Sequence, residues 1–180
     1  MHLNKLSVGS GNDAFEPNLA LYDDLRTLTG QTDIFKGMAV VLKVTLKLEN
    51  HEIWRRIAVP MYYTFKRLHG VLQVAFDWKD YHLYDFHIFD EESKTIPGYE
   101  LAHYNHAGYL PGGLQASLSL VDFELVFEHA DKNIPTASVD EVRLEDCVDD
   151  AKLWVYVYDF GDFWRHIIEI EAIIDDYEYN

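Results

Sequence analysis

The clearest pattern in the chain is an alternation of apolar and polar side chains that begins at residue 42. Leucine or valine at positions 42, 44, 46 and 48 alternates with lysine, threonine and glutamate, which predicts a strand with one buried face. With a two-residue loop at 50–51, the return strand gives the pairs Leu48–Ile53, Leu46–Arg55, Val44–Ile57 and Leu42–Val59. Arg55 then points into an apolar row, where an arginine needs a carboxylate partner or a path to solvent.

A helical period follows this predicted hairpin. Apolar residues at 65, 68, 72, 75 and 76 form one stripe, and Thr64 is a suitable N-cap, so we expect one main helix over about residues 64–77. His69 and Gln73 lie beside the stripe, one turn apart. Shorter helices are expected within residues 17–30 and before the last pair of strands, in residues 137–148.

The second half of the chain predicts further strands. Residues 82–89 form one strand, residues 90–113 a long loop, and residues 114–129 one or two strands. The aromatic and β-branched residues of the last segments suit a hairpin with a loop at Phe160 and Gly161. That loop gives the pairs Val157–Trp164, Val155–His166 and Leu153–Ile168, and places Arg165, Glu169 and Glu171 on the opposite face beside Trp154 and Tyr156.

Composition and charge restrict the class of protein. The 180 residues suffice for one domain, and no apolar run approaches the ~20 residues of a membrane span. The first residues lack the pattern of a signal peptide and there is one cysteine, so we expect a cytoplasmic protein. Thirty-one acidic against fifteen basic residues give a net charge of −16, which argues against nucleic acid as a partner. No nucleotide, metal or hydrolase motif is present, and none of the motifs requires a cofactor.

Residues 158–166, with the sequence YDFGDFWRH, hold the densest candidate chemistry. In the predicted register Asp159 and Asp162 face each other at the mouth of the hairpin, where like charges need compensation. In one interpretation Asp159 caps its own turn and Asp162 pairs with Arg55, which makes the stretch a structural lock.

The alternative interpretation is a pocket for a ligand or a metal ion. Asp159, Asp162 and His166 would form it, helped by His69 or His82, and two carboxylates with one histidine suit Mg²⁺, Mn²⁺ or Fe²⁺. His166 lies roughly 13 Å along the strand from Asp162, at about 3.3 Å per residue, so shared ligation would need a bulge. The sequence leaves both interpretations open.

The order and spacing of several motifs resemble the plasmid pRiA4b open-reading-frame-three-like family over residues 39–89 and 140–172. The matching residues are Trp54-Arg55-Arg56, Leu68-His69, Gln73, Trp78, His82-Leu83, the run from Tyr158 to Asp162, Trp164 and His166. The resemblance implies a single compact α+β domain over residues 37–180, with a curved, mostly antiparallel sheet, one main helix and one or two short helices. Residues 1–36 would be an N-terminal extension with a short helix, and the segment 90–139 is enlarged.

The residues that match these motifs coincide with those that the pairing argument leaves electrostatically unusual. They form one candidate pocket or structural network: Arg55, His69, Gln73, His82, Asp159, Asp162, Trp164 and His166. The first functional hypothesis is a non-enzymatic domain that binds a small ligand or a protein. The family resemblance implies in addition that it could be an accessory protein of mobile DNA. The alternative is a metal-dependent hydrolase-type enzyme that uses the Asp159, Asp162 and His166 cluster.

Overall fold

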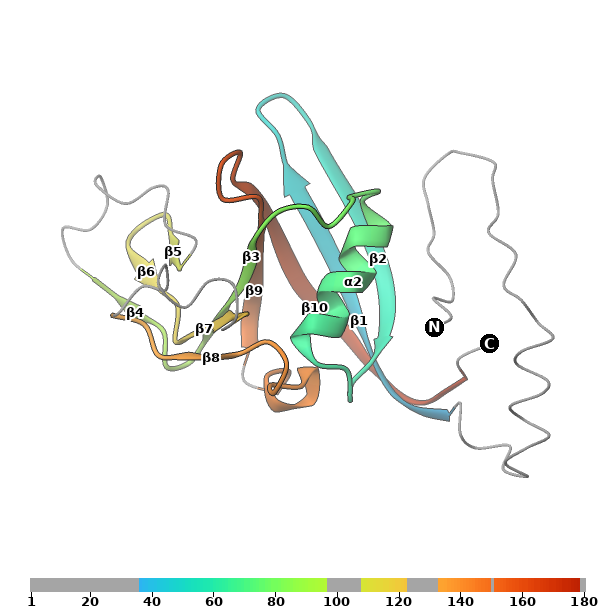
Figure 1. Ribbon diagram of the computed structural model, residues 1–180. Helices are drawn as coiled ribbons and strands as arrows, with labels where there is room; N and C mark the ends of the chain where they lie inside the picture. Colours follow the sequence, from blue (N-terminus) through green and yellow to red (C-terminus); the bar gives the residue numbers. More distant parts are fainter. Residues whose placement is uncertain (1–35, 97–107, 123–132, 150, 179–180) are drawn as a thin grey trace.

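The computed structural model describes residues 36–96, 108–122, 133–149 and 151–178 (Figure 1). The elements in chain order are β1 (Lys36–Lys47), β2 (Glu52–Pro60), α2 (Phe65–Ala75), β3 (Tyr84–Asp90), β4 (Lys94–Thr95), β5 (Tyr109–Leu110), β6 (Leu114–Gln115), β7 (Leu118–Val121), β8 (Thr136–Ser138), the 3₁₀ turn η2 (Leu144–Asp146), β9 (Ala151–Tyr158) and β10 (Trp164–Glu178). In this part of the chain no helix is long and apolar enough to cross a membrane.

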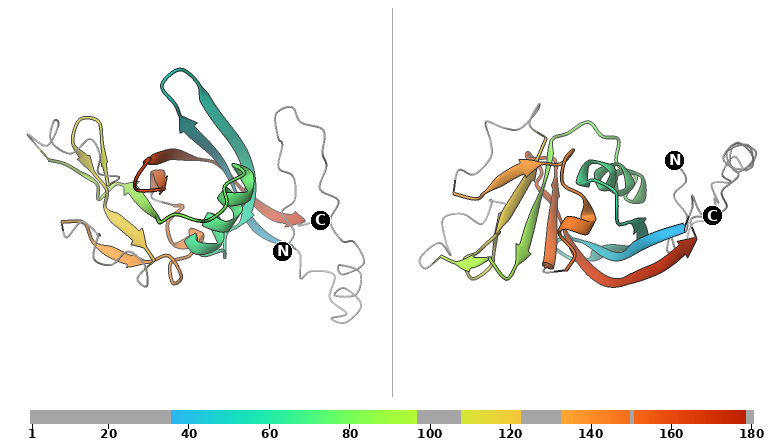
Figure 2. Two further views of the ribbon diagram at one scale, coloured as in Figure 1. Left: turned by 45° about the horizontal axis from the view of Figure 1, so that its top comes forward. Right: turned by 90° about the horizontal axis from the view of Figure 1, so that it is seen from below.

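Seven strands form one sheet in the order β2-β1-β10-β9-β3-β7-β8, and β4, β6 and β5 form a small second sheet. Every pair in the large sheet is antiparallel except β7 with β8. The helix α2 lies across one face of the large sheet, and the small sheet lies to the other side of β3 (Figures 1 and 2). The predicted α+β class with a mostly antiparallel sheet and one main helix is therefore confirmed.

Apolar side chains fill both faces of the central strand β9. Trp154, Tyr156 and Tyr158 pack under α2 in the larger core cluster, whereas Val155 and Val157 belong to a second cluster with residues of the small sheet. All five residues from 154 to 158 are at most 2% exposed. A strand buried on both faces has no reason to alternate between apolar and polar residues.

The helix begins and ends close to the predicted positions. Thr64 is the N-cap, and its hydroxyl accepts a hydrogen bond from the Arg67 N–H (3.4 Å). The predicted stripe is buried at Phe65, Leu68, Leu72 and Ala75. Asp77 follows in a left-handed conformation (φ 58°), which ends the helix before residue 77.

The predicted register of the β1–β2 hairpin is wrong by two residues. Val44 lies opposite Arg55, and Leu46 lies opposite Ile53. The loop contains the four residues 48–51 instead of two, and it is closed by the Leu48 N–H donating to the His51 carbonyl (2.9 Å). Because a two-residue slip preserves the side-chain period, Arg55 stays on the predicted face.

The predicted register of the β9–β10 hairpin is wrong by one residue, which exchanges the two faces. Trp164 pairs with Tyr158 and His166 with Tyr156, instead of Val157 and Val155. The connecting turn contains the five residues 159–163, with Asp159 and Phe163 at φ 61° and 59°. Trp164 and His166 therefore lie on the helix side with the aromatic residues of β9, and Arg165 lies opposite Val157.

The remaining segments follow the prediction in part. Residues 82–89 form β3, although His82 precedes the strand, and residues 114–129 contain β6 and β7 up to residue 121. The loop predicted at 90–113 contains β4 and β5, and the short helix predicted at 137–148 is η2. The helix expected within residues 17–30 lies outside the described residues.

Candidate functional site

Three buried side chains, His69, Gln73 and Tyr156, and the exposed Asp80 form a closed ring of hydrogen bonds at α2. The Gln73 side-chain amide donates to the Tyr156 hydroxyl (2.9 Å), and the Asp80 backbone N–H donates to Gln73 Oε1 (2.8 Å). His69 Nδ1 lies 2.8 Å from the Tyr156 hydroxyl, and His69 Nε2 lies 2.7 Å from Asp80 Oδ1. The ring joins the helix, β9 and the segment that follows the helix.

The ring fixes the tautomer of His69. An ionised Asp80 carboxylate only accepts, so Nε2 carries the proton and donates to it. Nδ1 is then an acceptor for the Tyr156 hydroxyl, which in turn accepts from Gln73. Each of the four groups therefore donates once and accepts once, and the arrangement is fully satisfied.

Burial of the Tyr156 hydroxyl and the His69 imidazole limits the chemistry of which the ring is capable. Tyr156 is 0% exposed, and His69 and Gln73 are at most 5% exposed. Burial raises the pKa of Tyr156. Burial also lowers the pKa of His69, although the nearby Asp80 carboxylate acts in the opposite direction. His69 also stacks on Tyr84, with ring centroids 3.5 Å apart. The ring thus holds a neutral imidazole between helix and sheet, where a substrate cannot reach the hydroxyl.

His166 occupies a separate, apolar position in the same core. It is 0% exposed, and its Nδ1 lies 3.0 Å from the Trp164 carbonyl and 3.4 Å from the Tyr156 carbonyl. Two acceptors at Nδ1 mean that this nitrogen carries the proton. Burial lowers the pKa of His166 to about 4, so the ring is neutral at pH 7.

Aromatic side chains cover His166 at the end of the sheet where the β9–β10 turn lies. We call Phe76, Trp78, Tyr158 and Trp164 the aromatic cluster. Trp78 lies 5.4 Å from Tyr158 and 5.5 Å from Trp164, measured between ring centroids, and Phe76 lies 4.8 Å from His166. Phe76, Trp78 and Trp164 are half-buried, so one side of the cluster faces solvent.

Arg55 lies at one border of the aromatic cluster. Its guanidinium is 5.4 Å from the centre of the Phe76 ring, and it donates to the Ala75 carbonyl (3.0 Å) and the Trp54 carbonyl (2.9 Å). The predicted ion pair between Arg55 and Asp162 is therefore wrong. One backbone carbonyl at the end of α2 (Ala75) and one in β2 (Trp54) satisfy this arginine instead of a carboxylate.

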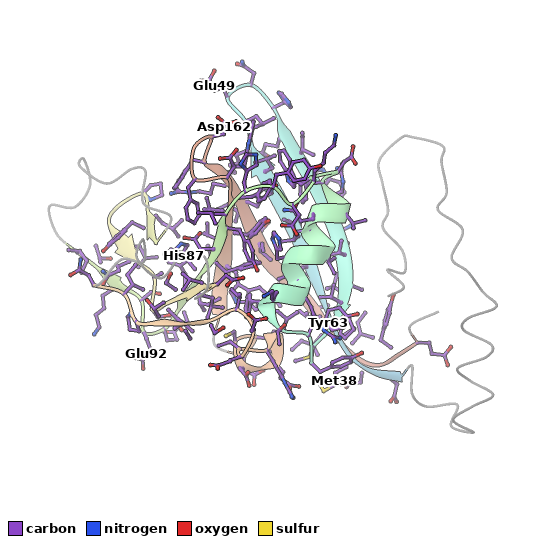
Figure 3. The ribbon with its side chains drawn as sticks, viewed as in Figure 1. Met38, Glu49, Tyr63, His87, Glu92 and Asp162 are labelled. Atoms are coloured by element: carbon purple, nitrogen blue, oxygen red, sulfur yellow. The ribbon has the colours of Figure 1, made fainter. Side chains whose placement is uncertain are left out.

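The DFGD stretch forms a turn capped by its own Asp159, whose backbone N–H also donates to the Leu83 carbonyl (2.9 Å). Asp159 Oδ1 accepts from the N–H groups of Gly161 (2.9 Å) and Asp162 (3.3 Å), which is the predicted Asx-type cap. Asp159 Oδ2 lies 3.5 Å from His82 Nε2, and the His82 side chain is 52% exposed. Asp162 is exposed at the tip of the turn, on the outside of the molecule (Figure 3).

The predicted residues therefore divide into three groups. His69 and Gln73 join the hydrogen-bonded ring, Arg55, Trp164 and His166 border or belong to the aromatic cluster, and His82 and Asp159 meet at the turn. Asp159, Asp162 and His166 do not converge, and within the described ranges no three histidine, cysteine or acidic side chains could hold a metal ion together.

Sequence reasoning missed two members of the ring, Tyr156 and Asp80. The wrong register placed Tyr156 on the opposite face from His166, and Asp80 enters the ring through both its backbone and its side chain. The one available signal was Gln73, a buried amide one turn after His69 that needs partners. The reasoning also missed Asp85 and His87 on the other face of β3, where Asp85 Oδ2 lies 3.1 Å from His87 Nε2 without the alignment of a hydrogen bond.

Comparison with known proteins agrees with this architecture. The crystal structure of the protein of unknown function MM3350 from Methanosarcina mazei Go1 superposes with a TM-score of 0.57 at 27% identity, over 83% of this chain and 67% of that chain. The chain thus has the α+β architecture of a solved protein, with the aromatic cluster and the ring on one side of its sheet.

The sequence match assigns this chain to a protein family. The family described as "Plasmid pRiA4b ORF-3-like protein" matches residues 38–180, and the chain belongs to it. The "Uncharacterized protein y4hQ" of Sinorhizobium fredii (strain NBRC 101917 / NGR234) is 33% identical over 136 residues. That match covers 73% of this chain and 53% of the relative, so the chain spans about half the length of this curated relative.

Proposed function

We propose that this chain is a protein-interaction domain and that the aromatic cluster is part of its contact surface. The observation that carries the proposal is the closure of the hydrogen-bonded ring. Its imidazole and hydroxyl are engaged with each other and buried, so they do not offer an acid, a base or a nucleophile to a substrate. What this end of the sheet does present to solvent is aromatic surface, which is enriched at protein interfaces.

The packing of the aromatic cluster favours a protein partner over a small ligand. Trp78 lies 5.4 and 5.5 Å from its two aromatic neighbours, so these rings touch and leave no room for a ligand between them. Tyr81 (80% exposed), whose backbone N–H donates to the Tyr158 hydroxyl (2.9 Å), and the exposed His82 lie at the rim of the cluster. His82 packs edge-on against Tyr158 at 5.6 Å, so the rim is continuous with the cluster.

The net charge of −16 supports a protein partner over nucleic acid. A link of such a domain to mobile DNA would then run through a bound protein, and we expect no shift of a duplex DNA probe in a mobility assay.

The experiment compares capture by three forms of the protein. The double variant Tyr81→Ala/His82→Ala removes the exposed rim, and Tyr62→Ala/Val74→Ala removes comparable exposed side chains elsewhere (53% and 59% exposed). We expect a partner from the native cell extract to bind wild type and the control pair but not the rim variant, as measured by quantitative mass spectrometry. Equal capture by all three forms, or a hydrolytic activity that depends on Asp159, would contradict the proposal.

A further inference from the structure

The strand β10 is paired on both sides only in its first third. It pairs with β1 over nearly its whole length, from Leu46–His166 to Lys36–Glu178. Its pairing with β9 covers only Trp164–Ile168. Residues 169–178 therefore have one strand neighbour among the described residues. The second view in Figure 2 shows β1 and β10 leaving the rest of the sheet together. Over residues 169–176 this segment is, within the described part of the chain, an open edge of backbone N–H and C=O groups.

The open edge carries charge of one sign. Residues 169–178 contain five carboxylates and no lysine or arginine. Glu169 is paired with Lys43, and Glu171 with Arg56. Asp175 and Asp176 are exposed and make no ion pair within the described part of the chain. Ile173, between these charges, is 42% exposed.

The other edges of the large sheet are less open. β2 ends at Pro60, and the Arg55 guanidinium donates to the Trp54 carbonyl of this strand (2.9 Å). β8 has only three residues. The edge of β10 is thus the longest one without such a cover in the described sheet.

We propose that this edge of β10 binds an extended basic peptide segment by adding it as a strand. The peptide backbone pairs with the N–H and C=O groups of residues 172–175, and a lysine or arginine on one face of the peptide lies opposite Asp175, with the adjacent Asp176 adding negative charge at the same end of the edge. The proposal is independent of the aromatic cluster, which lies at the other end of β10.

The same charges favour a basic peptide over a second copy of this chain as the occupant. Of the residues 172–178, neither of two paired β10 edges would bring a lysine or arginine to Asp175 and Asp176 of the other, and nearby like charges destabilise a strand pair. The regular part of the edge is also short. A register shift near Val41 and Leu42 marks an irregularity beside Glu171, and Asp176 has φ 53°. A bound strand therefore pairs mainly with residues 172–175.

The experiment uses the full chain and a short peptide of alternating lysine and valine, blocked at both ends. Amide exchange and chemical shifts are followed by NMR as the peptide is added. We expect slower exchange and shifted resonances at residues 172–175, and no effect of a matched glutamate–valine peptide. The affinity should also fall as salt is raised.

Two variants with the same net charge make the test specific. Asp175→Asn/Asp176→Asn and Glu49→Gln/Asp149→Asn each remove two exposed carboxylates, which changes the net charge from −16 to −14. Asparagine tolerates the positive φ of residue 176, so the first variant keeps its backbone. We expect the peptide affinity to fall at least threefold in the first variant and to stay unchanged in the second.

Three results would overturn the proposal. Equal loss of affinity in both variants would show nonspecific charge attraction, and unchanged affinity in both would place the peptide elsewhere. Amides 172–175 that are already protected without peptide, in a chain that does not bind it, would show that the protein fills this edge itself.

Discussion

Replacing Tyr156 by phenylalanine tests whether the hydrogen-bonded ring stabilises the fold. The change removes one hydroxyl and no apolar volume, and Tyr156 is 0% exposed. Two hydrogen bonds are lost, to His69 (2.8 Å) and from Gln73 (2.9 Å). Both partners stay buried without replacement, and a buried polar group left unpaired costs about 1–3 kcal/mol. We expect the free energy of unfolding to fall by about 3 kcal/mol, and Tm by about 6–12 °C for a chain of this length.

The assay is urea unfolding followed by tryptophan fluorescence, with thermal unfolding as a second measurement. Tyr81→Phe is the matched control, because this tyrosine is 80% exposed. Its hydroxyl removal should change stability by less than about 0.5 kcal/mol. If Tyr156→Phe unfolds at the same urea concentration as wild type, the ring contributes nothing and the reasoning is refuted.

Further predictions concern Asp159 and Asp162 of the turn, His166 and two glycines. Asp159→Ala should cost about 1–2 kcal/mol by urea unfolding, because alanine loses the cap and disfavours φ 61°, whereas Asp159→Asn should be nearly neutral. Asp162→Asn should match wild type in Tm, with or without Mn²⁺. A loss of several degrees would instead support the interpretation of Asp162 as a structural lock. Because the pKa of His166 falls to about 4 on folding, its stabilising contribution is present above pH 6.5 and is lost as the pH falls towards 4, by up to about 3 kcal/mol. Urea unfolding of His166→Gln should therefore show a weaker pH dependence than wild type over that window, and an identical slope would contradict the burial argument. Gly70→Ala, on the open face of α2, should stabilise by about 0.5–1 kcal/mol, whereas Gly108→Ala, whose Cβ would clash with the Cδ1 methyl of the buried Ile134, should destabilise, as Tm would show.

The sequence was sufficient to predict an element and its buried face where one face is buried and the other is exposed to solvent. The α2 stripe and its Thr64 cap were predicted for that reason, and Arg55 was assigned to the correct face of β2 despite a slipped register. In both cases the local period reports directly on burial. Residues 82–89 were also predicted as a strand, although Phe86, His87, Ile88 and Phe89 are all buried there, so this strand has no alternation of buried and exposed side chains.

The last hairpin could not be predicted by the same reasoning. β9 is buried on both faces, so its aromatic and aliphatic residues fit either register equally well. The decision depends on the turn, where Asp159 and Phe163 adopt positive φ although neither is glycine. The partners of Arg55 and His69 could not be predicted for a related reason. They include backbone groups and residues whose positions depend on that register.

The position of β10 in the sheet has a consequence for how the chain folds during synthesis. β10 lies between β1 and β9, and in the sheet order it alone joins the β2-β1 pair to the β9-β3-β7-β8 group. Its partners in β1 lie more than a hundred residues earlier, as in the Leu46–His166 pair. The two halves of the sheet must therefore wait, as separate and partly exposed units, until residues 164–178 leave the ribosome. Such late, long-range closure slows folding and lengthens the time during which unpaired strand edges are open to aggregation.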